Sequence, residues 1–397
     1  MKIGIITLVS DNYGNKFQNY AVETLMREYG EVETFRVEEC YRADSGNQKS
    51  ILQKLNPSYI KQVLTCRMMY TYDMKNAERS LLENLFYVQK NKKTLLKARE
   101  DRHKNFQDFE KQYLHISDKL ITHNDTASTW GEQYDYFVCG SDQIWNPGYA
   151  TTSDLAFLSF SPKEKNIALA PSFGVSAIPE SMREMYQKGI NGIEGLSVRE
   201  EAGKKIISEL TGRDAEVLVD PTMAIDVKEW ERIAKKPEID MPKKYILCYF
   251  LGRVDKKYKE AIRKVAKQKS LKIIPLFDIE HSEYYTLDPT EVLYCIKNAE
   301  MVMTDSFHGT VFSILFHKNC KLFERNEGGI SMSSRIETLL KKFELKDSYT
   351  GESICEIEKQ KWDRVDEILV SEKNKTVQYI KNALEINFNT MQRRRGE

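Results

Sequence analysis

The chain has 397 residues, 41% of them hydrophobic and 11% aromatic, which is enough to build the cores of two or three folded domains. Sixty basic residues stand against 59 acidic ones, so the net charge of +1 excludes a global attraction to nucleic acid. The apolar run from Met1 to Val9 is too short for a signal peptide or a membrane span, and we expect a soluble, cytoplasmic protein. Seven widely spaced cysteines without a Cys-x-x-Cys pair predict reduced core thiols, not disulfides or a zinc site.

The N-terminal residues predict a β-α-β unit. An almost continuous apolar run at 2–8 predicts a buried strand, and after a polar loop the apolar residues from Phe17 to Leu25 recur at helical spacing. A second strand is predicted at 31–37. Parallel strands joined by a helix form a sheet whose ligands bind beyond the carboxyl ends of the strands.

The following residues interrupt this alternation. Residues from about 50 to 128 are rich in Lys, Glu, Gln and Leu, and they predict a helical insertion packed on the first domain. We place that domain at 1–225. Strand-like runs return within it at 134–139, 166–170, 195–198 and 216–219.

A second domain is predicted at 243–345, after a charged stretch at 226–244 that is typical of a surface connection. It contains another β-α-β series whose last strand, 300–304, leads into a helix. The helical stretch at about 371–391 carries apolar residues on one face and is expected to pack back on the first domain. The predicted fold is therefore α/β, with two Rossmann-like domains facing across a cleft.

Common cofactor motifs are missing from the sequence. Neither domain has a G-x-G-x-x-G turn after its first strand, and there is no G-x-x-x-x-G-K-[ST] loop for a nucleoside triphosphate. There is also no H-E-x-x-H and no Asp-x-Asp pair to hold a divalent ion. We therefore expect no metal and no dinucleotide cofactor.

Polar and small side chains follow several of the predicted strands. Sugar hydroxyls need carboxylate, amide or hydroxyl partners, and the apolar face of a sugar ring packs on an aromatic side chain. Capped turns around a buried Trp are the alternative explanation of the same residues. We assign these turns to a sugar acceptor, bound by Asn12, Tyr13, Asn15, Ser141, Asp142, Gln143, Trp145, Asn146 and Ser172.

The turn 305–310 joins the last strand of the second domain to a helix and contains His308. A helix that begins at a strand end presents free backbone N–H groups to an anion. Arg199 follows the strand at 195–198, where a guanidinium is able to bind a carboxylate or a phosphate. The alternatives are a helix cap with a packed histidine, and a surface ion pair between Arg199 and Glu200.

Six stretches together resemble the polysaccharide pyruvyl transferase family, in order and approximate spacing over roughly residues 1–340. They are 12–15, 138–147, 170–174, 197–200, 220–222 and 304–310. The resemblance implies a glycosyltransferase-B-like fold and phosphoenolpyruvate as a co-substrate. The implied product is a pyruvyl ketal on two hydroxyls of a sugar, in a surface polysaccharide or in its lipid-linked precursor at the membrane.

By this resemblance the family's arginine and histidine fall on Arg199 and His308, which we predict to be catalytic. Many members carry Arg-Leu before the His-Gly pair, whereas this chain has Ser306 and Phe307, so one guanidinium is missing from the turn. Arg335 and Lys16 are the candidates to replace that charge. The predicted donor site consists of Ser306, Gly309, Thr310 and Arg335.

The implied reaction needs a proton at the terminal methylene of phosphoenolpyruvate and cations for the departing phosphate. With an unperturbed pKa of about 6.5, a histidine suits proton transfer, and His308 is expected either to act as general acid or base or to contact the phosphate. Asp11, Asp142 and Asp305 are candidates to deprotonate the acceptor.

Two functions of other kinds fit the same architecture. One is a glycosyltransferase that uses a nucleotide sugar, and the other is a non-catalytic carbohydrate-binding homologue. The missing arginine of the His308 turn keeps the second alternative open.

Overall fold

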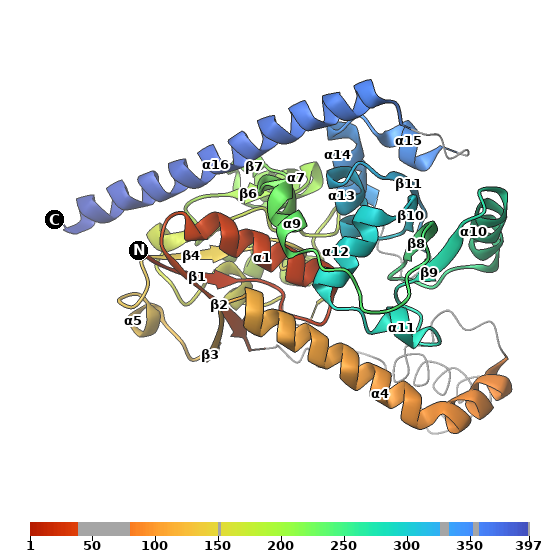
Figure 1. Ribbon diagram of the computed structural model, residues 1–397. Helices are drawn as coiled ribbons and strands as arrows, with labels where there is room; N and C mark the ends of the chain where they lie inside the picture. The colour runs from red at the N-terminus through yellow and green to blue at the C-terminus, as the bar shows by residue number, and fades with distance from the viewer. Residues whose placement is uncertain (39–79, 150–151, 326–332, 352–356, 396–397) are drawn as a thin grey trace.

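The first domain is built on a parallel sheet. The computed structural model describes residues 1–38, 80–149, 152–325, 333–351 and 357–395 (Figure 1). Its five-stranded sheet has the order β3-β2-β1-β4-β5, and every neighbouring pair is parallel. The strands are β1 (Lys2–Ile6), β2 (Glu31–Val37), β3 (Ile116–Ile121), β4 (Tyr136–Cys139) and β5 (Asn166–Ala168).

A short second ladder continues this sheet. β6 (Ser197–Val198) pairs in parallel with β7 (Glu216–Val217), and a bridge between Ile167 and Gly195 joins the ladder to β5. The carboxyl ends of β1, β4, β5 and β6 therefore meet at one edge, as expected for a parallel sheet. The covering helices include α1 (Tyr13–Arg27), α6 (Arg183–Asn191) and α7 (Glu201–Thr211).

The second domain has a four-stranded parallel sheet in the order β11-β10-β8-β9. Two parallel sheets with covering helices, joined in one chain, form the glycosyltransferase-B type of α/β architecture, which confirms the predicted fold class. The elements are β8 (Tyr245–Tyr249), α10 (Lys256–Gln268), β9 (Lys272–Pro275), α12 (Pro289–Asn298), β10 (Met301–Thr304), α13 (Phe307–Leu315), β11 (Asn319–Leu322) and α14 (Ser333–Lys342).

The residues predicted as a helical insertion are in fact the crossover between two neighbouring strands. They contain one long helix, α4 (Leu81–Tyr113), and then the edge strand β3, so the prediction of helix throughout to residue 128 is wrong at 116–121. Only Ser117 and Ile121 are buried in β3, and this polar edge strand resembles a helix surface in composition. Residues 50–79 lie outside the described part of the chain.

Helix α4 contacts both domains. At about 1.5 Å per residue its 33 residues extend over roughly 50 Å. Arg102 of α4 donates hydrogen bonds to the Tyr13 hydroxyl and to the Tyr285 carbonyl, each 2.7 Å long. Tyr13 in turn donates to the Leu287 carbonyl at 2.7 Å. The start of α1 is thereby tied to the second domain.

The C-terminal helix α16 (Lys359–Arg395) also runs along both domains (Figure 1). The Tyr379 hydroxyl donates to the Ala168 carbonyl at the end of β5, at 2.8 Å. Glu372 forms an ion pair of 2.7 Å with Lys342 of α14. The helix is longer than the predicted 371–391, because its first turns pack on the second domain through Val365 and Leu369.

An aromatic cluster joins the two domains. The rings of Phe17 in α1 and Phe312 in α13 lie 4.8 Å apart, and Trp230 lies 5.8 and 5.0 Å from them. All three side chains are fully buried. Trp230 belongs to α9 (Val227–Ile233), so the predicted surface connection at 226–244 contains a helix that anchors the interface.

The four described cysteines are free, buried thiols, as the sequence predicts: Cys139, Cys248, Cys295 and Cys320. Burial raises the pKa of Cys248 and Cys320 to about 12, so neither is ionised at neutral pH. The remaining three, Cys40, Cys66 and Cys355, lie outside the described residues.

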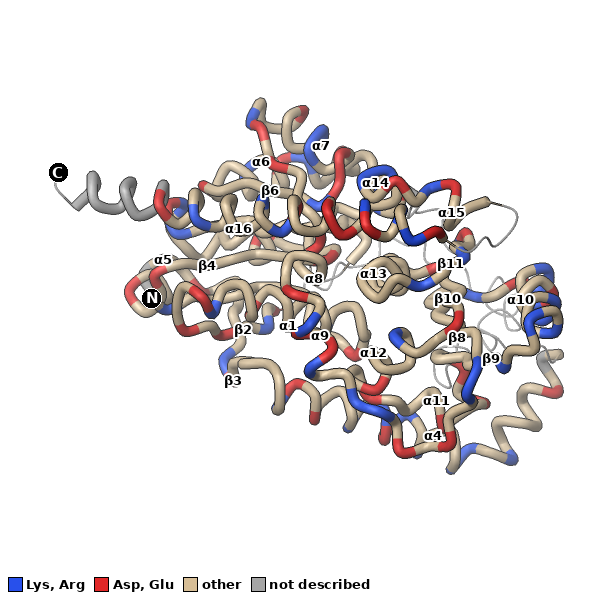
Figure 2. Tube along the Cα trace, turned by 45° about the horizontal axis from the view of Figure 1, so that its top comes forward, with Lys and Arg blue, Asp and Glu red and all other residues tan. Residues whose placement is uncertain are grey.

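Charged side chains of both signs are spread over the surface, and basic residues gather along α10 (Figure 2). Within the described part of the chain, no helix combines the length and hydropathy that a membrane span requires.

Removing the Tyr13 hydroxyl tests the link between α1 and the second domain. Tyr13→Phe leaves the buried Leu287 carbonyl and one Arg102 donor without their partner, and we expect it to lower the free energy of unfolding by about 1–3 kcal/mol. Urea unfolding followed by circular dichroism measures this change. Tyr29→Phe, at a half-buried ring of the same core, is the control; equal midpoints for the two variants would contradict the link.

Candidate active site

His308 lies at the junction of the two domains. Ser306 caps α13 by accepting a hydrogen bond of 3.3 Å from the Gly309 amide, which places His308 in the first turn. The His308 ring rests on Gly14 of α1, where an added Cβ would lie 2.2 Å from Nδ1. A glycine is therefore needed at position 14 for the two helices to approach this closely.

A buried carboxylate faces the histidine. His308 Nε2 lies 3.7 Å from the Asp220 carboxylate, and both side chains are buried. Asp220 also accepts hydrogen bonds from the Thr222 amide at 3.0 Å and the Thr222 hydroxyl at 2.7 Å. These bonds fix Asp220 at the start of α8 (Pro221–Ala224).

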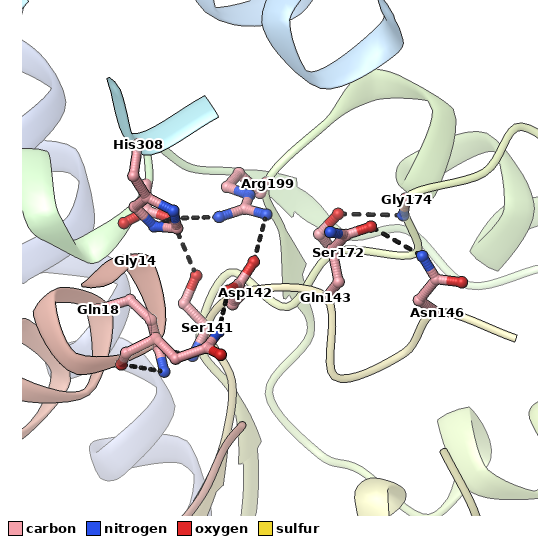
Figure 3. A network of polar contacts seen from close by, with 12 residues as sticks. Gly14, Gln18, Ser141, Asp142, Gln143, Asn146, Ser172, Gly174, Arg199 and His308 are labelled. Atoms are coloured by element: carbon pink, nitrogen blue, oxygen red, sulfur yellow. Dashed lines mark hydrogen bonds and ion pairs between the residues drawn. The ribbon is translucent and has the colours of Figure 1, made fainter. Parts of the chain in front are cut away.

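Arg199 is buried between two carboxylates (Figure 3). Its Nη1 pairs with Asp220 and its Nη2 with Asp142, the latter at 3.3 Å. Burial opposes the positive charge, but the two carboxylates outweigh it and raise the pKa of Arg199. The guanidinium carbon also lies 4.3 Å from the centre of the Phe307 ring, which places Arg199 against the second domain.

The turn after β4 brings Asp142 to Arg199. Asp142 has a positive φ of 52°, its backbone carbonyl accepts from the Ser172 amide at 2.7 Å, and its carboxylate accepts from the Asn15 amide group. The Ser141 amide donates to Gln18 of α1 at 3.0 Å. Side chains from the ends of β1, β4 and β5 are thus joined in one network (Figure 3).

Glu200 holds the neighbouring turn after β5. One of its carboxylate oxygens, Oε1, accepts from the Ser172 hydroxyl and from the Phe173 amide, each at 2.9 Å. Glu200 itself is fully buried. Ser172 therefore supports the turn, and its hydroxyl is engaged.

Three buried polar atoms of this region have no hydrogen-bond partner among the described residues: Nε2 of His308, Nε of Arg199 and Oε2 of Glu200. Buried polar atoms without partners are rare in folded proteins and need an explanation. Their proximity here indicates a site that a polar ligand completes.

Arg335 of α14 contributes a second buried guanidinium. It is 3% exposed, and its guanidinium carbon lies 5.7 Å from the centre of the Phe307 ring. Burial, followed by the positive charge of Arg199, lowers the pKa of Arg335 to about 10. Two cations are therefore held against one aromatic ring, an arrangement that an anion between them would stabilise.

The protonation of His308 follows from this environment. Burial lowers the pKa of His308 from its ordinary value of 6.5, Asp220 and Asp142 oppose the shift, and Arg199 favours it. The net shift is downward, so the imidazole is neutral at neutral pH and able to accept a proton.

The predicted role of Trp145 as a sugar platform is wrong, and Tyr13, which was predicted to bind the acceptor, is buried as well. Trp145 is fully buried, donates from Nε1 to the Ala156 carbonyl at 3.0 Å, and stacks on Phe157 with ring centres 5.0 Å apart. Tyr13 is equally buried in the domain interface. Both rings belong to hydrophobic cores. From the sequence of a turn alone, a buried aromatic ring is not distinguishable from an exposed one.

The predicted anion contacts of Gly309 and Thr310 are also wrong. The Gly309 amide donates to the Ser306 side chain, and the Thr310 amide donates to the Ser306 carbonyl at 3.0 Å. The Ser306 hydroxyl is the cap itself. The helix amides without an intrahelical acceptor are those of Phe307 and His308, at its first turn.

Other candidate charges point elsewhere. Lys16 forms a buried ion pair with Glu110 of α4, and Asp11 pairs with His103 of the same helix. Asp305 accepts from the Leu251 amide at 2.7 Å and pairs with Arg325, so it stabilises the loop after β8. All three side chains are therefore engaged in other ion pairs, and their roles as donor or acceptor contacts stay predictions.

The remaining predicted acceptor residues shape the turns. Asn12 caps α1 by accepting from the Gly14 amide at 2.8 Å. Asn146 donates to Gln143 at 2.7 Å within the loop after β4. Of the predicted acceptor set, Asp142 touches Arg199 directly, and Asn15 reaches the site through Asp142.

A comparison with protein families decides what kind of protein carries this site. The model of the family described as polysaccharide pyruvyl transferase matches residues 12–326, most of the chain. This chain belongs to the polysaccharide pyruvyl transferase family. The match includes Arg199, Asp220 and His308 and ends before Arg335.

Solved structures resemble this polysaccharide pyruvyl transferase family member only in overall arrangement. The UDP-N-acetylglucosamine 2-epimerase from Methanocaldococcus jannaschii has a TM-score of 0.42 and 12% identity, covering 94% of this chain and 100% of that one. The enzyme of the same name from Neisseria meningitidis has a TM-score of 0.41 and 12% identity, covering 99% and 100%. No curated protein sequence matches the chain.

Sequence reasoning missed several residues of the site in this pyruvyl transferase family member. Asp220 follows β7, and the sequence places it near the end of a predicted strand. Its ion pair depends on Arg199, which extends to it from the neighbouring strand β6. Gln18 and Gly14 lie on α1, and nothing local marks Gln18 as the partner of Ser141 or Gly14 as the contact of His308. Within the described residues, no group of three or more His, Cys, Asp or Glu is placed to hold a metal ion.

Titration of His308 tests the electrostatics of the site. Because Asp220 raises the pKa of His308, Asp220→Asn is expected to lower a pKa that already lies below 6.5. Carbon-13 NMR of the imidazole groups, with His308→Gln to assign the resonance, gives both midpoints. Asp366→Asn, beside the exposed His317, is the control that leaves His308 unchanged; a midpoint that rises in Asp220→Asn would refute this electrostatic picture.

Proposed function

We propose that this protein transfers the pyruvyl group of phosphoenolpyruvate to two hydroxyls of a sugar, forming a ketal and releasing phosphate. The observation that carries the proposal is a set of buried atoms on His308, Arg199 and Glu200 that have no hydrogen-bond partner in the described part of the chain, together with the second buried guanidinium of Arg335. Membership of the polysaccharide pyruvyl transferase family supports it. We expect no resident cofactor.

The donor has a phosphate and a carboxylate, and two arginines suit two anionic groups. The Nε of Arg199 has no hydrogen-bond partner among the described residues, although its two terminal nitrogens are paired with Asp142 and Asp220. Arg335 approaches the other donor group from α14. It supplies the guanidinium that Ser306 and Phe307 omit from the turn, since Phe307 contacts both arginines.

His308 moves the proton of the acceptor. The neutral imidazole takes a proton from one sugar hydroxyl as that oxygen bonds to C2 of phosphoenolpyruvate, while C3 gains a proton and becomes a methyl group. Cleavage of the C2–O bond releases phosphate, and the second hydroxyl closes the ketal. The two hydroxyls lose two protons in all: one equivalent is gained at C3 and the other leaves with phosphate.

The acceptor is a sugar of a polysaccharide or of its lipid-linked precursor. We place the reaction in the cytoplasm, with a lipid-linked acceptor presented at the membrane surface. The Asp142 carboxylate and the side-chain amides that follow it in the turn after β4 are suited to sugar hydroxyls. Asp142 contacts the same Arg199 that binds the donor, so the two substrates would meet at His308.

Donor binding is tested by substituting Arg335. Arg335→Met keeps the length of the side chain and removes its charge, and we expect affinity for phosphoenolpyruvate to fall about 10- to 100-fold. Isothermal titration calorimetry measures it, with Arg364→Met on exposed α16 as the control. Tight binding of UDP-sugars with no binding of phosphoenolpyruvate would favour a glycosyltransferase instead.

Proton transfer is tested by substituting His308. His308→Gln retains a polar side chain but cannot accept the proton, so phosphate release should fall about 10²- to 10⁴-fold while phosphoenolpyruvate affinity changes little. Phosphate is measured with phosphoenolpyruvate and a panel of methyl glycosides. His317→Gln, at the exposed histidine after α13, should release phosphate at the wild-type rate. Retained turnover in His308→Gln would remove His308 from the chemistry.

A further inference from the structure

The loop between Asp142 and Tyr149 is held in one conformation by its own polar groups. The Asn146 amide donates to the Gln143 carbonyl at 3.0 Å, and the Tyr149 amide donates to the Asn146 carbonyl at 3.1 Å. Gly174, with a φ of 65°, lets the neighbouring turn pack against Gln143, where a Cβ would lie 2.1 Å from the amide oxygen. The loop is therefore a rigid edge of the site.

The two aromatic rings of this loop have opposite surroundings. Trp145 is fully buried and anchors the loop from below, whereas Tyr149 is 38% exposed. Phe86 at the start of α4 is the other exposed large aromatic among the residues whose side chains are described. Only Tyr149 of these two belongs to a loop that begins at the site.

The hydroxyl of Tyr149 is hydrogen-bonded to the first residues of the same loop. Gln143 donates a hydrogen bond of 3.0 Å to it. Burial raises the pKa of Tyr149, and Asp142 raises it further, while Arg335 and Arg325 oppose the shift. Tyr149 is therefore an exposed aromatic side chain whose hydroxyl is bonded to Gln143, the residue next to Asp142.

We propose that Tyr149 is the platform on which the pyranose ring of the acceptor stacks. A sugar presents an apolar face of C–H groups and an edge of hydroxyls, and it needs an aromatic ring beside polar partners. Tyr149 supplies the ring, and Asp142 with Gln143 supplies the polar edge. The anionic donor has no such apolar face, so this subsite selects the second substrate.

The inference rests on the proposed function only for the identity of that substrate as a sugar acceptor. The fixed loop limits the entropy lost on binding, because neither the ring nor Gln143 has to be ordered by the ligand. A stacked ring would present two neighbouring hydroxyls toward Asp142 and His308, the geometry that ketal closure needs.

Saturation-transfer NMR with four probes tests the platform: the methyl pyranosides of galactose, glucose, mannose and N-acetylglucosamine. We expect ring protons of at least one glycoside to be saturated by the wild-type protein. Tyr149→Ala and Tyr149→Leu should weaken its binding roughly tenfold, whereas Tyr149→Phe should bind within about threefold of wild type. Phe86→Ala is the control for an exposed aromatic elsewhere, and it should bind as wild type.

The outcomes separate this subsite from the proposed reaction. Unchanged glycoside binding in both Tyr149→Ala and Tyr149→Leu, or no glycoside binding by the wild-type protein, would overturn the platform. Phosphoenolpyruvate affinity measured by calorimetry should be the same in the Tyr149 variants and the wild type. Tyr149-dependent glycoside binding without phosphate release would keep the sugar subsite and reject pyruvyl transfer.

Discussion

The contact between α1 and α13 is the constraint on which the site depends. Phe17 and Phe312 pack with Trp230 at the domain interface, and one turn along the two helices Gly14 meets His308. A shift of one helix by a single turn, about 5.4 Å, would separate His308 from Asp220. The packed rings of this interface therefore position α13 against α1, together with the hydrogen bonds of Arg102 and Tyr13.

Charge balance is the second constraint. A buried ion is tolerated only when it is paired, and Arg199 has both Asp142 and Asp220 within an ion-pair distance. This pairing immobilises the guanidinium and leaves only its Nε without a partner. Arg335 has a lowered pKa, first because it is buried and then because Arg199 is positively charged. A negative charge placed beside Arg335 would act in the opposite direction and favour its charged form.

The fold and part of the site follow from the sequence for one physical reason. Parallel strands bring their carboxyl ends to one edge, so the residues after β4 and β6, Asp142 and Arg199, were predictable as neighbours. Which aromatic ring is exposed was not predictable. Trp145 and Tyr149 occur in one polar loop, and Trp145 is the buried one because it packs on Phe157 and Phe173. The availability of backbone donors was not predictable either, because the Gly309 amide donates its hydrogen bond to the Ser306 side chain that caps the helix.

Phe307 is the contact that Arg199 and Arg335 share. It stands in the turn before His308, and its ring contacts Arg199, which follows β6, and Arg335 of α14. An arginine in that turn would add a third cation near Arg199 and Arg335, while Asp142 and Asp220 are already paired with Arg199. One aromatic ring therefore contacts two guanidinium groups that lie far apart in the sequence.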